Sequence, residues 1–159
     1  MEDRIRRAEE ADIDALAEMY LELHNFHAAA IPSRLRPVAR VDHRLLHGIR
    51  KILGDPGAII LVASAGDRVV GFAEVHLHET EEDPAIVQRR YAHLQSLFVF
   101  PACRRQRLGT ALVRAAHRWA QEQGATEMEV DSWEFPDGPL TFHEKLGYAT
   151  QKRRMVTRL

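Results

Sequence analysis

The segment from Val99 to Leu112 constrains the fold more than any other part of the chain. A strand-like apolar run ends at Pro101, and a helical repeat of apolar residues follows a run of arginines. The first amides of a helix have no partner within the helix and lie at the positive end of its dipole. Such a helix start binds phosphate readily. The segment therefore predicts a strand–turn–helix unit with a pyrophosphate site, the alternative being a solvated, arginine-rich first turn.

The size and composition of the chain set broad limits on its function. Its 159 residues suffice for one domain with its own core, and no linker divides residues 1–159. A net charge of -1 argues against a dedicated nucleic-acid-binding or membrane-surface protein. The single cysteine, Cys103, excludes an intrachain disulfide and a cysteine-based metal site. Because the sequence shows neither a membrane-spanning apolar run nor a signal-peptide core, we expect a cytoplasmic location.

Apolar periodicity predicts helices and strands in a mixed order. Helical spacing predicts helices over residues 11–29, 42–53, 105–123 and 140–146. Strand-like runs predict strands over residues 4–7, 58–63, 69–78, 91–99, 127–131 and 148–159. An acidic surface loop is expected over residues 79–88. This order predicts an α/β (mixed α+β) fold with a mixed, mostly antiparallel sheet of six or seven strands and helices on both faces.

Three separated motifs resemble the GNAT superfamily of N-acetyltransferases. The stretch from Arg104 to Gly109 matches the family's coenzyme A loop, Gln/Arg-x-x-Gly-x-Gly/Ala. The run from Phe142 to Tyr148 is similar to the family's Phe-Tyr-Glu-Lys-Leu-Gly-Phe element. The opening run from residue 5 to residue 12 also resembles the start of a GNAT domain. Together with the order of elements, the resemblance covers nearly the whole chain.

The resemblance implies a sheet whose fourth and fifth strands splay apart, with acetyl-CoA as cosubstrate in the gap and no metal. The main chain of the fourth strand would hold pantetheine, and the loop after it would hold the pyrophosphate. The residues that this implies for cofactor binding are Leu97, Phe98, Val99, Arg104, Arg105, Gln106, Arg107, Leu108, Gly109, Thr110 and Phe142.

Arg107 departs from the family pattern, which usually has glycine at this position. Helical dihedral angles do not require glycine. We therefore expect that the family's glycine lets the main chain approach the phosphate closely. An arginine whose side chain turns outward would keep that approach, so we expect cofactor binding to survive.

The resemblance also implies direct attack of an amine on the thioester, after a base has removed the amine's proton. His93 occupies the position of a glutamate base in several members, and imidazole titrates near neutrality. The alternative for His93 is a half-buried strand histidine bonded to a neighbour. Glu74, which shares a strand face with His76, is a second candidate base. His143 replaces the family's tyrosine acid and is a candidate acid itself, the alternatives being solvent or Tyr148.

In this family the first two helices and the loops after the third and fifth strands select the acceptor. The candidate substrate-binding residues are His24, Asn25, His27, Gln95, Asp131 and Trp133. The run from Asp131 to Phe135 resembles one in small-molecule acetyltransferases, including aminoglycoside-type members. Its acidic and aromatic residues would favour a cationic amine, although Trp133 and Phe135 are also ordinary packing groups.

We therefore expect an N-acetyltransferase that moves an acetyl group from acetyl-CoA to a primary amine of a small molecule in a ternary complex. A protein or peptide acetyltransferase, acting on a lysine or an N-terminus, is an alternative. An inactive acetyl-CoA-binding sensor domain is another. A covalent route through Cys103 is disfavoured against direct transfer, and nucleic-acid binding is disfavoured by the net charge. A homodimer is expected from the resemblance alone.

Overall fold

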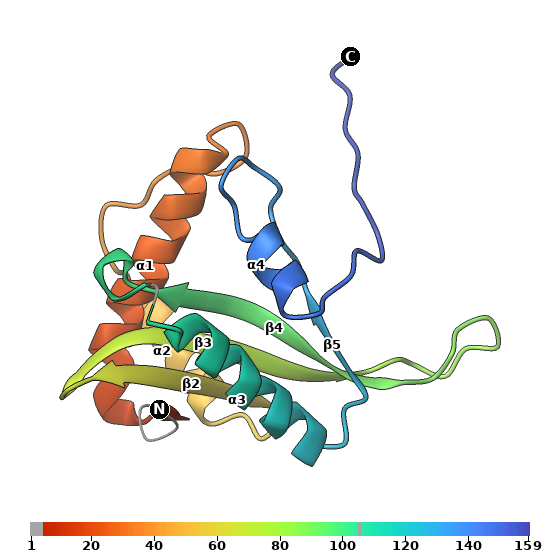
Figure 1. Cartoon of the computed structure of the whole chain (residues 1–159), viewed down its shortest axis with the longest axis horizontal. Helices are drawn as coiled ribbons and strands as arrows, with labels where there is room; N and C mark the ends of the chain where they lie inside the picture. Colours follow the sequence, from red (N-terminus) through yellow and green to blue (C-terminus); the bar gives the residue numbers. More distant parts are fainter. Residues whose placement is uncertain (1–4, 105) are drawn as a thin grey trace.

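The computed structural model describes residues 5–104 and 106–159. A central sheet carries α1 (Ile13–Ala30) and α2 (His43–Leu53) on one face and α3 (Leu108–Glu122) on the other (Figure 1). The short helix α4 (Leu140–Lys145) follows the last strand. The expected helices on both faces are confirmed. Arg105 and residue 4, which the predicted helix and strand included, lie outside the described residues.

The sheet has the order β1-β2-β3-β4-β5. Its strands are β1 (Ile5–Arg7), β2 (Ala58–Ala65), β3 (Arg68–Glu79), β4 (Arg90–Val99) and β5 (Glu127–Val130). The pairs β1–β2, β2–β3 and β3–β4 are antiparallel. The pair β4–β5 is parallel, as the crossover through α3 requires. The expected mixed sheet with a majority of antiparallel pairs is therefore present.

The expected number of six or seven strands was wrong, because the described residues form a sheet of five. The strand predicted over residues 148–159 is absent. This tail extends away from the body of the protein (Figure 1), and Met155, Val156 and Leu159 are exposed. Cross-strand side-chain pairs stabilise a sheet, and the polar run from Gln151 to Arg154 brings no apolar side chains to such pairs.

Two apolar cores lie on opposite faces of the sheet. On the face of α3, Ala73 and Val75 of β3 pack in a core with Leu112. On the face of α1 and α2, Phe72 packs with Leu16. Successive strand residues point to opposite faces, so Glu74 projects on the same side as Phe72. A carboxylate is therefore placed on the otherwise apolar face of α1 and α2.

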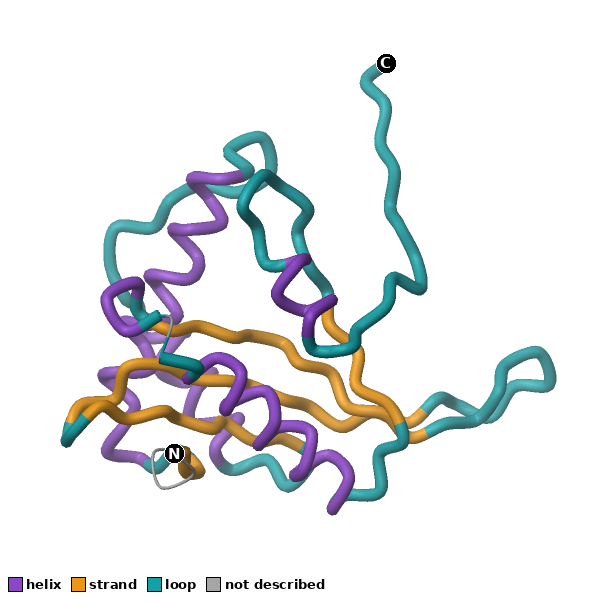
Figure 2. Tube along the Cα trace, in the orientation of Figure 1, coloured by secondary structure: helices purple, strands orange, loops and turns teal. Residues whose placement is uncertain are grey.

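The strands β4 and β5 pair over only part of their length. Their register runs from Tyr91 opposite Glu127 to Leu94 opposite Val130, where β5 ends. The rest of β4, Gln95–Val99, has no β5 partner in the described structure, and we call it the unpaired stretch of β4. Figure 2 shows the chain after β5 leaving β4 and leading through a loop to α4.

A register shift lies at the start of the unpaired stretch. Glu74 of β3 is opposite Ser96, but the next residue, Val75, is opposite Leu94. Gln95 is therefore an extra residue on β4, as in a β-bulge. Alternation along β4 predicts Gln95 on the face of His93, and Gln95 does line the same cavity as His76, the partner of His93. The alternation breaks one residue later, where Ser96 takes the position opposite Glu74 on that same face.

Candidate active site

The helix α3 begins at a residue with a left-handed main chain. Arg107 is the N-cap, with φ of 61° and ψ of 11°. A residue other than glycine is disfavoured there by about 1 kcal/mol. The expectation that this position has ordinary helical dihedral angles was therefore wrong. The family's glycine suits a positive φ, and arginine occupies that conformation here under strain.

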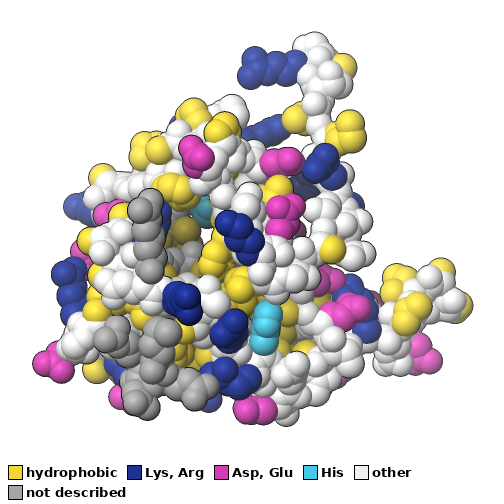
Figure 3. Space-filling model, in the orientation of Figure 1, with side chains coloured by type: hydrophobic (Ala, Val, Ile, Leu, Met, Phe, Trp, Pro, Cys, Tyr) yellow, Lys and Arg dark blue, Asp and Glu magenta, His cyan; other side chains and the backbone are white. Residues whose placement is uncertain are grey.

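The start of α3 is open to an anionic ligand. Within the described residues no side chain caps the helix, so the amides of Leu108, Gly109 and Thr110 are not held by one. Lys and Arg side chains lie across the middle of the face that α3 covers (Figure 3). Cationic side chains near a helix start add to the attraction of its dipole for phosphate. Gln106 is exposed beside this start.

Arg104 links the loop to the end of β4. Its Nε donates a hydrogen bond of 3.0 Å to the main-chain oxygen of Val99, the last residue of the unpaired stretch. Its guanidinium carbon lies 5.7 Å from the centre of the Phe26 ring on α1. The arginine that matches the first motif position therefore holds the loop against the strand and carries its charge close to α1.

Phe142 of α4 packs on the first turn of α3. A Cβ atom built on Gly109 would lie 3.5 Å from the Cζ atom of Phe142, an ordinary van der Waals contact. The expected cofactor residues Phe98 and Val99 have buried side chains on opposite cores, and Leu97 is partly buried. Any contact that Phe98 and Val99 make with a cofactor would therefore come from their main chain.

His143 is buried beside this junction with an unsatisfied nitrogen. Its exposed fraction is 5%, and its Nδ1 atom has no hydrogen-bond partner among the described residues. Burial lowers the pKa of His143. The ring of Tyr148 lies 5.5 Å away, centre to centre, and its hydroxyl shares a 2.8 Å hydrogen bond with Nε2 of His117. Burial raises the pKa of Tyr148 to about 12, so it remains protonated at neutral pH.

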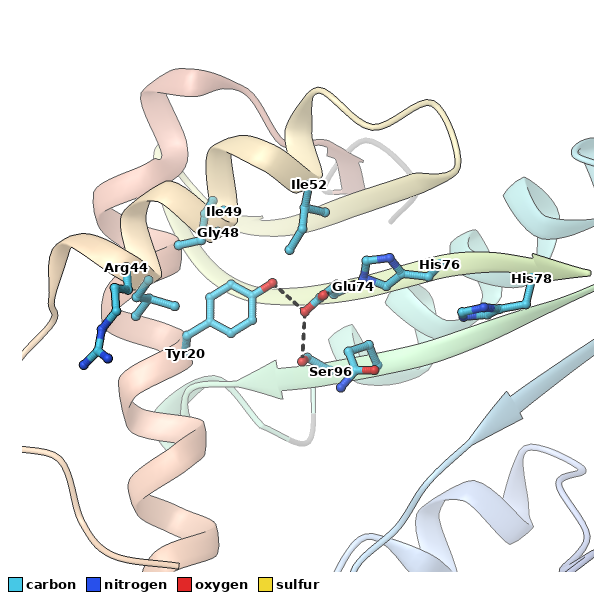
Figure 4. A pocket seen from close by; sticks show the side chains of 11 residues that line it. Tyr20, Arg44, Gly48, Ile49, Ile52, Glu74, His76, His78 and Ser96 are labelled. Carbon is cyan, nitrogen blue, oxygen red and sulfur yellow. Dashed lines mark hydrogen bonds and ion pairs between the residues drawn. The ribbon is translucent and has the colours of Figure 1, made fainter.

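Glu74 lies at the centre of a polar cluster on the opposite face of the sheet (Figure 4). Its Oε2 accepts hydrogen bonds from the Tyr20 hydroxyl at 2.7 Å and the Ser96 hydroxyl at 3.0 Å. Its Oε1 lies 2.7 Å from Nε2 of His76. These partners compensate the burial of Glu74, which is 5% exposed. Burial and the neighbouring carboxylate raise the pKa of Tyr20, which therefore remains a donor.

The Glu74 cluster borders a cavity of about 530 Å³. The cavity is lined by Tyr20, Arg44, Leu45, Gly48, Ile49, Ile52, Glu74, His76, His78, Gln95 and Ser96. Strands β3 and β4 form its floor, and α2 supplies most of its apolar wall (Figure 4). Gln95 and Ser96 belong to the unpaired stretch of β4, which therefore runs from this cavity to the loop before α3.

His93 lies opposite His76 in the β3–β4 register but does not line the cavity. Its Nε2 is 3.4 Å from Oδ2 of Asp131, and its ring centre is 6.2 Å from that of His78. Asp131 is fully exposed just beyond β5, and Trp133 is 45% exposed. Asp131 and Trp133 do not line the cavity. His93, Asp131 and Trp133 therefore lie outside the cavity that Glu74 borders.

His24 and Asn25 of α1 bind the loop between α1 and α2. The Nε2 atom of His24 is 2.7 Å from the main-chain oxygen of Arg36, and Asn25 exchanges two hydrogen bonds with the main chain of Val38. The ring centre of the next predicted residue, His27, is 6.3 Å from that of Phe135 in the loop after β5. Burial lowers the pKa of His27. Of the predicted acceptor residues, only Gln95 lines the cavity.

Sequence reasoning missed Tyr20 and Ser96. Tyr20 fits the apolar periodicity of α1, a pattern that predicts a packing residue rather than a hydrogen-bond donor to Glu74. Strand alternation identified the shared face of Glu74 and His76, but the register shift concealed that Ser96 would join them.

The described part of the chain contains neither a candidate membrane-spanning helix nor a candidate metal site. None of its helices has the length and apolar character needed to cross a membrane. No group of three or more His, Cys, Asp or Glu side chains in it is arranged to hold a metal ion.

The described residues thus combine a helix start without a side-chain cap, an unpaired strand edge and a polar cavity in one α/β fold. Residues 13–148 match the model of the acetyltransferase (GNAT) family. The chain therefore belongs to this family.

Known relatives agree with this assignment. An aminoglycoside N(6')-acetyltransferase type 1 of Klebsiella aerogenes is 34% identical over 77 residues, which cover 48% of this chain and 49% of the relative. The match thus spans about half the length of that curated protein.

Solved structures show the same fold at low sequence identity. A tetramutant of the BH1408 protein from Bacillus halodurans has a TM-score of 0.87 at 20% identity, with 98% of this chain and 99% of that chain covered. An aminoglycoside 6'-N-acetyltransferase from Acinetobacter haemolyticus has a TM-score of 0.75 at 20% identity, with 98% and 97% covered.

Proposed function

We propose that the chain is an acetyl-CoA-dependent N-acetyltransferase that acetylates the primary amine of a small molecule. The observation that carries this proposal is the unpaired stretch of β4. Its first residues, Gln95 and Ser96, line the cavity, and its last residue, Val99, is bonded to Arg104 of the phosphate loop. The unpaired stretch of β4 therefore connects the proposed phosphate site at the start of α3 with the cavity, where the amine would bind.

The residues at the start of α3 fit the phosphate end of coenzyme A. The uncapped amides of Leu108, Gly109 and Thr110 would bind the pyrophosphate, and Arg104 would add positive charge. The main chain of the unpaired stretch offers hydrogen-bonding groups to the pantetheine arm. When bound, acetyl-CoA supplies an activated acetyl group as a thioester.

His76 is the base that this geometry favours. An ionised carboxylate only accepts hydrogen bonds, so the ring nitrogen that faces Glu74, Nε2, carries the proton. The other nitrogen, Nδ1, then has a lone pair that can take a proton from the substrate ammonium. Glu74 would stabilise the resulting imidazolium and fix its orientation, while Tyr20 and Ser96 hold Glu74.

His93 is the less favoured base in this proposal, and His143 acts on the leaving group. His93 is a second candidate base, but it approaches the exposed Asp131 and lies outside the cavity lining. His143 is neutral near pH 7 because burial lowers its pKa. It would therefore stabilise a departing thiolate by donating a hydrogen bond rather than by transferring a full charge.

Calorimetry with coenzyme A and a thiol-release assay with acetyl-CoA test the proposal. We expect binding of coenzyme A, and thiol release that depends on an added amine. Acetyl-CoA should also raise the melting temperature through linkage. Binding without thiol release for any small amine or peptide would favour the sensor alternative, and absence of binding would remove the proposal.

Aminoglycosides are the first amine class to test, because the Klebsiella relative is named for them. Thiol release with a lysine-containing peptide, but with no small amine, would favour the peptide acetyltransferase instead. The homodimer and the cytoplasmic location remain predictions from the sequence, and light scattering tests the first of them.

A further inference from the structure

Gly48 lies in the middle of α2, where glycine destabilises a helix relative to alanine. The main chain does not require glycine here, because Gly48 is not among the residues with positive φ. Packing does not require it either, because a Cβ atom built on Gly48 would have no described neighbour within 4 Å apart from the adjacent residues and the main chain of its own helix. The open space in front of Gly48 is the cavity, which Gly48 lines.

The wall of the cavity around Gly48 is apolar. Leu45, Ile49 and Ile52 come from the same helix, and the Tyr20 ring closes the side towards α1 (Figure 4). A side chain on residue 48 would occupy space between these groups and the sheet. The glycine therefore widens an apolar chamber whose polar end is the Glu74 cluster.

The charges around the cavity suit one ammonium group rather than several. Among the described residues that line the cavity, Glu74 is the one acidic side chain, and it already has three polar neighbours. Arg44, whose side chain is 83% exposed, brings a positive charge to the lining and is partly neutralised by Asp42 at 2.9 Å. A second ammonium near Arg44 would meet like charge and no carboxylate of the lining.

We propose that Gly48 shapes this cavity for the apolar arm of a primary amine with a single positive charge. The ammonium lies at the His76–Glu74 end, the apolar arm lies against α2, and Arg44 selects against a second ammonium. Polycationic aminosugars are then poor acceptors. This inference rests on the proposed function and names its substrate class.

A matched pair of amines tests the charge rule with the full chain and acetyl-CoA. Hexylamine and 1,6-diaminohexane have similar arms and differ in the second ammonium. We expect kcat/KM to be about tenfold or more higher for hexylamine, and kanamycin to be slower still. Arg44→Gln should narrow the difference between hexylamine and the diamine.

Variants of Gly48 test the shape of the chamber. Gly48→Leu should raise KM for hexylamine about tenfold or more, and should change KM for methylamine little. Gly48→Ala should raise the melting temperature by about 2–4 °C and raise KM for hexylamine. His47→Leu, on the exposed neighbour of Gly48 outside the lining, is the control and should leave KM unchanged.

Calorimetry with coenzyme A separates this inference from the proposed function. Loss of coenzyme A binding by the wild-type chain would remove both. With binding intact and thiol release observed for at least one amine, kanamycin as the best acceptor, no turnover of hexylamine, or an unchanged hexylamine KM in Gly48→Ala would overturn this inference alone. The alanine variant keeps the test decisive if Gly48→Leu does not fold.

Discussion

The Glu74 cluster and the buried His143 lie on opposite faces of the sheet and differ in how their polar atoms are satisfied. Both oxygens of Glu74 have hydrogen-bond partners, whereas Nδ1 of His143 has none within residues 5–104 and 106–159. A buried polar atom without a partner costs about 1–3 kcal/mol. The protein accepts that cost in one region and avoids it in the other.

This difference indicates two ways of preparing a site. The Glu74 cluster is complete without a ligand, so its orientation of His76 does not have to be created during the reaction. His143 keeps an unused hydrogen-bonding atom beside Phe142, which packs on the first turn of α3. Removing groups from the two regions should therefore have different effects on stability and rate.

The largest expected effect comes from removing the base of the complete cluster. His76→Asn should lower kcat/KM by about 10²–10⁴-fold. Asparagine fills part of the same space but has no ring nitrogen that can accept the proton of the substrate ammonium. Thiol release measures the rate. The matched control is His93→Asn on the adjacent strand, which should stay near the wild-type rate. Equal losses in the two variants would contradict the assignment of His76.

A smaller effect is expected from Glu74→Gln, which keeps the shape of the side chain but removes its charge. Tyr20 and Ser96 can still donate to the amide oxygen, so the fold should survive. The rate should fall by about 10²-fold, because the imidazolium of His76 loses its counter-ion. Calorimetry should show unchanged coenzyme A affinity, and weakened cofactor binding would point to a structural role instead.

His143→Phe should lower kcat by about tenfold and raise stability by about 1 kcal/mol, because it removes one thiolate donor and one unsatisfied nitrogen. Measuring kcat alongside denaturant unfolding would show both changes. Loss of stability in this variant would indicate that His143 has a partner.

The pH dependence of stability gives a second measure of His143. Because burial lowers its pKa, the unfolded chain binds a proton at higher pH than the folded chain does. The contribution of His143 to the free energy of unfolding is largest above the unfolded pKa of about 6.5. It decreases as the pH falls from there towards the lower pKa of the folded state. His143→Phe should flatten this acid slope. Part of the slope should persist, since burial also lowers the pKa of His27 and His117.

The smallest effect is expected at the start of α3. Arg107→Gly should raise the melting temperature by about 2–4 °C, because glycine adopts the positive φ of this residue without strain. Arg107→Ala is the control for the side chain, since alanine keeps the strain and should give no such gain. A higher melting temperature for alanine as well would contradict the strain argument.

Much of the fold could be predicted from the sequence because apolar periodicity is a local signal. It located α2 and β4 to within a residue or so, and strand alternation placed Glu74 with His76. The positive φ of Arg107 could not be predicted, because a motif letter does not specify a dihedral angle. The absent final strand could not be excluded, because strand formation depends on partners that are distant in sequence.

The extra residue in β4, Gln95, changes which face of the sheet the later side chains of this strand point to. If Gln95 took an ordinary position opposite Glu74, every side chain from Ser96 to Val99 would project from the other side of the sheet. The side chain of Phe98 would then point to the core that now holds Val99, and Val99 to the core that now holds Phe98. The Ser96 hydroxyl would no longer reach the carboxylate of Glu74. Deleting one residue from β4 at this shift would therefore turn one half of the strand over relative to the other, whereas a substitution that keeps the length of β4 would leave both halves facing as they do.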